Sequence, residues 1–242
     1  MTTLDRDVVA QAPPLPTRLD GARRILTAAA MFVAPWGFVV TNSGYAWAIR
    51  NGGSDSTGAE ALALVAPQPD LFRVVVVAGM LGSLLLVPAV LGTMALARRS
   101  WLVFVGGSLM VAGYVCYLAV LLTNIKTIAM AEVGGPLADY ARVIDASESD
   151  PSVSWVFGLF VAGNLLGTLL FAIGLLRSRA VPAWAAILIM LWPPLHVIGL
   201  VVGNELFEVT GAVLQSIAFA GIAVVVLSRS YRNGRPGARV RA

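Results

Sequence analysis

The sequence predicts an all-α polytopic membrane protein. It is expected to be a bundle of six transmembrane helices, with both termini in the cytoplasm (N-in/C-in) and short amphipathic helices in the external loops. Composition, six long apolar runs and the placement of charge support this fold class. Of 242 residues, 58% are hydrophobic and only 12% are charged, and the mean hydropathy is +0.82. Soluble domains carry about 25% charged residues, so we infer that lipid surrounds most of this chain.

Six apolar segments of 23 or 24 residues are separated by polar connections. About 20 residues cross the hydrocarbon core at a rise of ~1.5 Å each, so every segment is long enough to span. Helix is expected because each backbone polar group in lipid must be satisfied within its own segment. The predicted spans are 25–47, 74–97, 101–123, 153–176, 181–203 and 206–228.

Charge is distributed unevenly between the two sides of these spans. The two terminal segments and the turns after the second and fourth spans hold 13 of the 17 basic residues and three acids. The other three connections hold four basic and ten acidic residues. Basic residues remain cytoplasmic, so this bias predicts that both termini are cytoplasmic. Four tryptophans lie at predicted span ends, where indole prefers the headgroup region: Trp47, Trp101, Trp155 and Trp184.

The predicted membrane domain covers residues 23–228, between a disordered cytoplasmic N-terminus at 1–22 and a basic cytoplasmic tail at 229–242. We expect the Arg-rich tail to contact anionic lipid headgroups rather than nucleic acid. A short helix is expected at 59–66 in the first external connection, capped by Ser56 or Thr57. A second is expected in the third connection, with its apolar face formed by Leu137, Tyr140, Ala141 and Ile144. These helices either cover the spans or form a lid or a docking surface.

No Asp, Lys or Arg lies inside a predicted span, and Glu208 is only about 3 Å from a span end. Ion-coupled carriers need ionisable groups near the midplane, so this pattern disfavours them. Nucleotide-binding, metalloprotease and CxxC motifs were sought and none is present. We therefore predict no catalytic residue, metal ligand or cofactor, and an enzyme is disfavoured.

His196 is the only histidine and follows Pro193 and Pro194. The two prolines remove backbone donors, so the carbonyls they free need other partners. The preferred interpretation is a histidine hydrogen-bonded to a neighbouring helix. The alternatives are a haem or metal ligand or a proton-responsive switch, although no cysteine or carboxylate lies at ligand spacing.

Two stripes of small and polar residues lie on predicted spans. Span 6 carries one at i, i+4, i+7 and i+11, and span 4 has a GxxxG pattern at Gly163 and Gly167. Such stripes are typical of helix-packing seams, which is the preferred interpretation. The functional alternative is a shallow, outward-open pocket for a lipid headgroup or small amphiphile. Its candidate ligand-binding residues are Asn42, Asn164, His196, Glu205, Glu208 and Gln215.

Residues 77–85 and 161–170 resemble each other, and the second segment contains one additional residue. Both belong to spans that precede an arginine-containing turn. This pattern is a weak indication of a parallel hairpin repeat.

The order of parts resembles uncharacterised six-helix integral membrane proteins of high-GC bacteria, a class that is a domain of unknown function. The resemblance rests on a short helix leading into 63–70, an apolar span with Leu-Leu-Leu-Val-Pro-Ala at 84–89, and Leu-Leu-Arg-Ser-Arg-Ala-Val-Pro-Ala-Trp at 175–184. It covers about residues 25–228 and implies a six-span fold in the bacterial inner membrane. It implies no activity and no site residues.

Three functional hypotheses follow. The first is a non-catalytic accessory, sensory or scaffold component of the cell membrane, working with a membrane-protein partner or as a homo-oligomer. The second is a small transporter, or a lipid- or amphiphile-binding protein with an outward-facing pocket. The third is a haem- or redox-linked membrane protein that uses His196.

Overall fold

The computed structural model describes residues 18–233, which are helical apart from short connections. Six of the helical stretches are long and apolar enough to cross a membrane, which confirms the predicted number of spans. The fourth span is built from α6, η1 and α7, which run on without a break. The elements are α1 Arg18–Ile49, α2 Gly58–Val65, α3 Pro69–Leu96, α4 Trp101–Val133, α5 Leu137–Glu148, α6 Pro151–Ala162, η1 Gly163–Gly167, α7 Thr168–Ser178, α8 Ala183–Val202 and α9 Leu206–Asn233.

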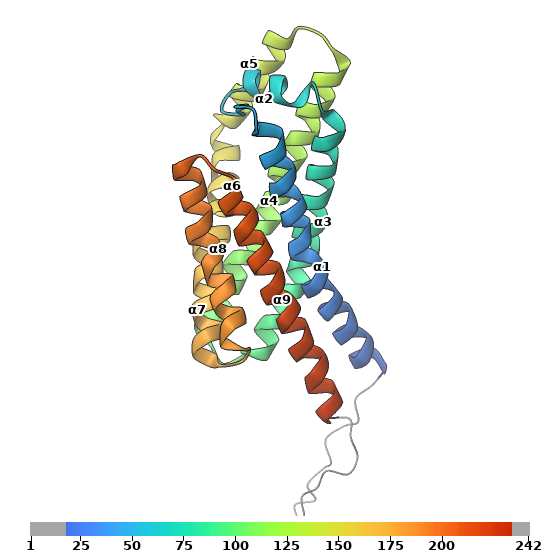
Figure 1. Cartoon of the computed structure of the whole chain (residues 1–242), viewed down its shortest axis with the longest axis vertical. Helices are drawn as coiled ribbons and strands as arrows, with labels where there is room; N and C mark the ends of the chain where they lie inside the picture. Colours follow the sequence, from blue (N-terminus) through green and yellow to red (C-terminus); the bar gives the residue numbers. More distant parts are fainter. Residues whose placement is uncertain (1–17, 234–242) are drawn as a thin grey trace, which may run out of the picture.

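The six spans form a closed ring. α1 packs against α3 and α9, and α3 packs against α4. α4 lies along α6, η1 and α7, and the ring is completed by α7 on α8 and α8 on α9. α1 begins and α9 ends at the same end of the bundle, whereas α2 and α5 lie at the opposite end (Figure 1). The α8–α9 turn stops short of the level of α2 and α5, so the wall of the bundle is lower there (Figure 1).

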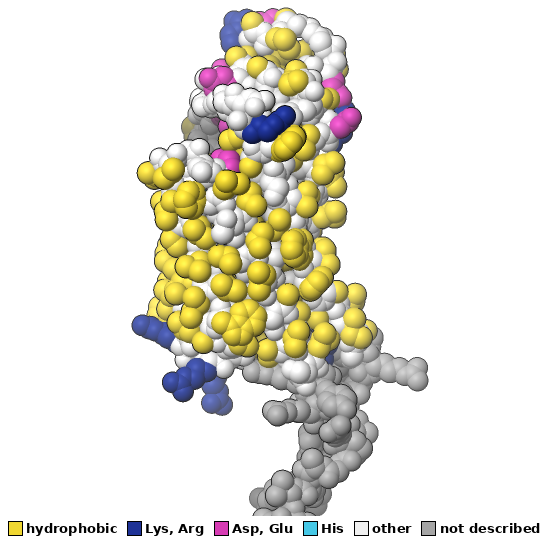
Figure 2. Space-filling view, viewed as in Figure 1, with side chains coloured by type: hydrophobic (Ala, Val, Ile, Leu, Met, Phe, Trp, Pro, Cys, Tyr) yellow, Lys and Arg dark blue, Asp and Glu magenta, His cyan; other side chains and the backbone are white. Residues whose placement is uncertain are grey.

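Side-chain chemistry divides the surface into three zones (Figure 2). A broad apolar belt surrounds the middle of the bundle, with large side chains as exposed as Val201 (81%). One end, the arginine end, carries the turns with Arg98, Arg99, Arg177 and Arg179. The other, the acidic end, carries α2, α5 and the acid-rich connections. Water-soluble monomers rarely expose an apolar belt of this extent, so the belt is the lipid-facing surface of a multi-pass membrane protein.

Helix boundaries differ from the predicted spans, most of all at the acidic end. α4 runs ten residues beyond the predicted end at 123 and contains Lys126 and Glu132. Hydropathy marks where lipid ends, whereas a helix continues while its backbone bonds and packing persist, so the two limits need not coincide. At the N-terminus, residues 18–22 are helical rather than disordered, and the rest of the predicted segment 1–22 lies outside the described residues. Residues 229–233 of the predicted tail are also helical, and 234–242 lie outside the described residues.

Glycines allow α4 to pack closely against the fourth span. A Cβ atom added to Gly106 would lie 2.3 Å from the backbone nitrogen of Phe171, and one on Gly113 would lie 2.7 Å from the Cα of Gly163. At Gly167 the nearest atom would be the nitrogen of Met110, at 2.7 Å. The GxxxG stripe therefore forms a packing seam, as the preferred interpretation predicted.

Both predicted loop helices are present, and they pack against each other at the acidic end. Thr57 caps α2 by accepting a hydrogen bond from the Glu60 backbone N–H. The Gly58 N–H donates to Asp145 Oδ1 on α5 at 2.6 Å. A Cβ on Gly58 would lie 2.4 Å from the carbonyl oxygen of Ala141, so the two helices touch backbone to backbone. Together α2 and α5 cover the acidic end of the bundle.

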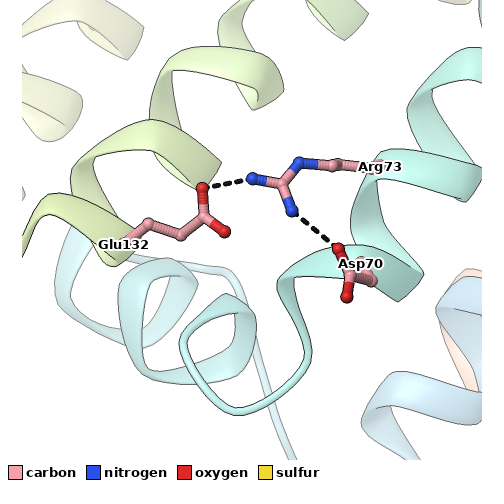
Figure 3. Close-up of polar contacts among 3 residues, drawn as sticks. All are labelled: Asp70, Arg73 and Glu132. Atoms are coloured by element: carbon pink, nitrogen blue, oxygen red, sulfur yellow. Dashed lines mark hydrogen bonds and ion pairs between the residues drawn. The ribbon is translucent and has the colours of Figure 1, made fainter.

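An ion-pair network joins α3 to the extended end of α4. Arg73 on α3 donates to Asp70 Oδ1 at 2.7 Å and also to the Glu132 carboxylate on α4 (Figure 3). The three side chains are exposed, so water and salt screen both pairs and they contribute little to stability. The network mainly fixes the position of the α4 extension beside α3.

Candidate functional site

A cavity of about 650 Å³ lies inside the bundle and extends to the acidic end. On α4 its lining runs from Tyr114 to Met130, which is about 24 Å at a rise of ~1.5 Å per residue. α2 and α5 contribute to its upper wall, and exposed side chains such as Asn124 and Lys126 mark its rim. The cavity is therefore long and narrow, and it reaches from the lipid-embedded part of the bundle to the water-exposed end.

Three buried polar side chains from three helices close the floor of the cavity. Asn164 of η1 accepts hydrogen bonds on Oδ1 from the Tyr114 hydroxyl of α4 at 2.7 Å and from Trp192 Nε1 of α8 at 2.9 Å. All three residues are at most 5% exposed. Because these groups satisfy one another, the floor presents mainly aromatic surface to the cavity.

The π-helical segment η1 places Asn164 at this junction. π-helical turns are rare and often occur at functional sites. Gly163 and Gly167 lie in η1 and face α4 across the glycine seam. Asn164, between them, faces the cavity instead. The wide turn therefore combines a tight helix contact with a polar group directed inward.

One face of α8 forms the next part of the wall. Trp192, His196 and Leu200 recur at i, i+4 and i+8, and all three line the cavity. The rings of Trp192 and His196 lie 5.4 Å apart. His196 Nδ1 is 3.3 Å from Glu208 Oε2 on α9. Gly199 leaves space for this carboxylate, because a Cβ there would lie 3.2 Å from Glu208 Cγ.

The middle of the cavity is aromatic. Tyr117 of α4 stacks on Phe160 of α6 with ring centroids 4.5 Å apart and an interplanar angle of 15°. Phe38 of α1 packs on Tyr114 with centroids at 4.9 Å. Apolar side chains of α1, α3 and α4 fill the space between these rings. This section suits an aliphatic or aromatic ligand.

Acidic side chains concentrate toward the rim. Four carboxylates line the cavity against a single lysine and a single histidine: Asp55, Glu148, Glu205 and Glu208, with Lys126 and His196. The Tyr45 hydroxyl donates to Asp55 Oδ1 at 2.7 Å. Burial raises the pKa of Glu205 to about 7; Glu208 and Asp55 act in the same direction, while His196 opposes them. Burial and the nearby acids Asp145 and Asp55 also raise the pKa of Glu148.

The structure brings five of the six sequence-predicted site residues to this one cavity. Asn42, Asn164, His196, Glu205 and Glu208 all line it. Ligand binding by these residues stays a prediction. Asn42 Nδ2 is a buried donor without a hydrogen-bond partner among the described residues, so it is available to a ligand.

Gln215 is separate from this group. Its side chain is 1% exposed and does not line the cavity, and it lies next to the side chain of Tyr114, which does line it. The i, i+4, i+7, i+11 spacing placed it on the stripe with Glu208, but burial among the other helices keeps it behind the cavity wall.

Sequence reasoning missed the two donors to Asn164. Tyr114 and Trp192 lie deep in their spans, away from the headgroup region that Trp and Tyr prefer. A buried indole N–H or phenol needs a hydrogen-bond partner. Their position was therefore a usable signal that a polar acceptor lies at the same depth.

His196 Nδ1 lies 3.3 Å from the Glu208 carboxylate on the neighbouring helix α9, but it forms no hydrogen bond within the described residues, so the hydrogen-bonded histidine stays a prediction. Across residues 18–233, no three His, Cys, Asp or Glu side chains gather closely enough to hold a metal ion. The chemistry at hand is acid–base and hydrogen-bonding chemistry around an aromatic cavity, which suits binding.

No protein-family model, curated protein or solved structure matches the chain. The site is therefore interpreted from its own geometry.

Proposed function

We propose that this membrane protein binds a small amphiphile in the cavity, which the ligand enters from the acidic end, and that it acts as a receptor or carrier rather than as an enzyme. The observation that carries this proposal is the 650 Å³ cavity with an aromatic interior and a polar rim. Binding sites of about 300–1,000 Å³ with few polar groups are typical for small molecules. A scaffold role would need no such internal space.

We also propose the bacterial cell membrane as the location, with the acidic end outside and both termini cytoplasmic. Support comes from the 13 basic residues at one end of the spans against four at the other. Usage of 16 arginines with one lysine, Lys126, fits a high-GC bacterial genome. The ligand would then arrive from outside the cell or from the outer leaflet.

The test is equilibrium dialysis of radiolabelled dodecyldimethylamine N-oxide against the full chain in phosphatidylcholine nanodiscs, with empty nanodiscs as background. One saturable site per protein is expected. Val120→Trp should weaken binding at least about tenfold, because Val120 lines the cavity and the larger ring fills it. Leu122→Trp is the matched control, because Leu122 lies on the same helix, is 49% exposed and is not a lining residue.

Two results would contradict the proposal. One is that neither dodecyldimethylamine N-oxide nor its charged analogue dodecyltrimethylammonium binds more than to empty nanodiscs. The other is equal affinity of the Val120→Trp and Leu122→Trp proteins when both are monodisperse. Thr127→Trp, nearer the rim, replaces Val120→Trp if that protein does not fold.

A further inference from the structure

The cavity is lined by more carboxylates than basic side chains, which indicates the charge of its ligand; this inference rests on the proposed function. We infer that the ligand carries a positively charged amine or quaternary ammonium group, which lies beside the acidic and aromatic side chains of the cavity while its apolar part follows the apolar lining. Three independent features support this: the sign of the lining charge, the rings beside it, and the length of the apolar section.

The first feature is charge that the protein does not neutralise. The titratable and charged groups facing the rim are Tyr45 from α1, Asp55 from the α1–α2 connection, Lys126 from α4, Glu148 from α5, His196 from α8, and Glu205 and Glu208 from the start of α9. Lys126 is exposed and forms no ion pair within the described structure. Even with a protonated His196, the four carboxylates outnumber the cations by two.

Burial makes this imbalance significant. Glu208 is only 8% exposed, and among the described residues its one ion-pair contact is with His196, whose Nδ1 lies 3.3 Å from Glu208 Oε2. A partly desolvated carboxylate is costly unless a positive group compensates it. The electrostatic attraction for a ligand cation is also stronger here than at an exposed surface, because less water screens it.

The second feature is the set of aromatic rings next to these acids. Tyr45 lies at the rim, bonded to Asp55, and the stacked Tyr117 and Phe160 pair lies below it. Ring faces attract ammonium groups, and quaternary ammonium ligands are commonly held by several aromatic side chains. Carboxylates and aromatic rings that line the same cavity therefore suit an organic cation.

The third feature is the length of the apolar section. Between Tyr114 and Asn124 on α4 the lining extends about 15 Å, at a rise of ~1.5 Å per residue. The lining includes Phe38, Val75 and Leu121 along this length. An extended chain of about ten carbons can lie along this length. Glu208 contacts His196, one helical turn from the floor residue Trp192, so a charged group beside Glu208 lies close to the aromatic rings.

An inorganic cation fits the cavity poorly. Within residues 18–233 no cluster of three His, Cys, Asp or Glu groups is close enough to coordinate a metal ion. An ion of that kind would also leave the aromatic section empty.

The test compares two probes of nearly the same shape in the nanodisc dialysis assay at pH 8. Dodecyltrimethylammonium carries one positive charge, and dodecyldimethylamine N-oxide carries no net charge. After subtraction of binding to empty nanodiscs, the cation is expected to bind at least about tenfold more tightly to the wild-type protein. Dodecyl sulfate, the anionic counterpart, is expected to bind more weakly than the N-oxide.

The Glu205→Gln/Glu208→Gln double variant keeps side-chain shape and removes two charges. It should bring the two affinities to within about threefold of each other, because it weakens binding of the cation. Asp139→Asn is the matched control: Asp139 lies on α5 at the same end, is exposed and pairs with Arg142, but does not line the cavity. This variant should retain the full preference for the cation.

The outcomes separate the two proposals. If the N-oxide and the cation bind equally and Val120→Trp weakens both, the cavity binds amphiphiles but the charge inference is wrong. An unchanged preference in the double variant would overturn it as well. If neither probe binds above empty nanodiscs, the proposed function itself fails. Asp55→Asn/Glu148→Gln provides a second pair of rim substitutions if the first double variant does not fold.

Discussion

The Asn164 side chain is the polar junction on which the cavity floor depends, and Asn164→Leu tests it most directly. Leucine has the same branched shape and the same number of side-chain heavy atoms as asparagine, so the change removes hydrogen bonding while it keeps the shape of the side chain. Both donors, the Tyr114 hydroxyl and the Trp192 indole N–H, then lose their acceptor. They come from α4 and α8, so the hydrogen bonds that connect these two helices through Asn164 are lost.

The magnitude follows from burial and from the number of bonds lost. Tyr114 is 2% and Trp192 is 5% exposed, so neither donor reaches bulk water. A buried donor left unpaired costs about 1–3 kcal/mol in water-soluble proteins. Side-chain hydrogen bonds between membrane helices average about 0.6 kcal/mol, with a maximum of about 1.7 kcal/mol. Because the donors line a cavity that a water molecule can enter, we expect a total loss of about 1–3 kcal/mol for the two bonds.

The assay is a double-mutant cycle on reversible unfolding in mixed detergent micelles, with Asn164→Leu, Tyr114→Phe and the double variant. Tyr114→Phe removes only the hydroxyl, so it also removes one orphaned donor from the Asn164→Leu protein. The double variant should therefore be more stable than the sum of the single effects predicts, by about 0.5–1.5 kcal/mol. A coupling free energy within about 0.3 kcal/mol of zero would refute the reasoning, as would an Asn164→Leu protein as stable as the wild type.

Three further predictions concern packing, pH and orientation. Gly106→Ala should lower the free energy of unfolding by about 1–3 kcal/mol, because its Cβ would lie 2.3 Å from the Phe171 nitrogen. Gly158→Ala is the control: a Cβ there would meet no atom within 4 Å, so the change should be neutral or stabilising by up to about 1 kcal/mol. Equal effects of the two substitutions would contradict the close packing of α4 on the fourth span. Because the pKa of Glu205 rises from 4.5 to about 7 in the folded protein, the folded state holds a proton that the unfolded chain has released, so stability should be greatest below pH 4.5 and fall as pH rises through 7. Thermal unfolding at pH 5 and pH 8 should show this fall, and Glu205→Gln should reduce it; an unchanged pH dependence in the variant would assign it to other groups. Single cysteines at positions 55 and 145, in a cysteine-free background, should react with an impermeant reagent added to intact cells, whereas labelling only after the cells are opened would reverse the proposed orientation.

The elements that sequence analysis predicted correctly are those fixed by local pattern. The six spans follow from runs of apolar residues, and α2 and α5 follow from a cap at Thr57 and from periodic spacing. The extension of α4 was missed because its residues beyond 123 are polar enough to leave lipid yet remain helical. Hydropathy carries information about the solvent around a segment and little about where its hydrogen-bonded backbone ends.

The candidate site was predictable only in part, because it depends on which helices touch. Polar residues such as Asn42 and Glu208 were conspicuous in apolar surroundings, which located one end of the cavity. The pairing of Asn164 with Tyr114 and Trp192 joins residues 50 and 28 positions apart, and no spacing rule predicts such contacts. Gln215 was predicted to belong to the site because it shares a helix face with Glu208, but it does not line the cavity.

The surplus residue in 161–170 relative to 77–85 falls within the π-helical turn at Gly163–Gly167. A helix with fixed ends takes up one inserted residue as a wide turn, so that the residues beyond it keep the faces they would have without the insertion. Deleting Leu166, which faces outward and is 51% exposed, would therefore remove the wide turn and leave Gly163 and Gly174 both against α4. A regular α-helix that retained the residue would instead rotate one of these glycines away from α4 by about 100°, so the wide turn lets the longer segment keep both contacts.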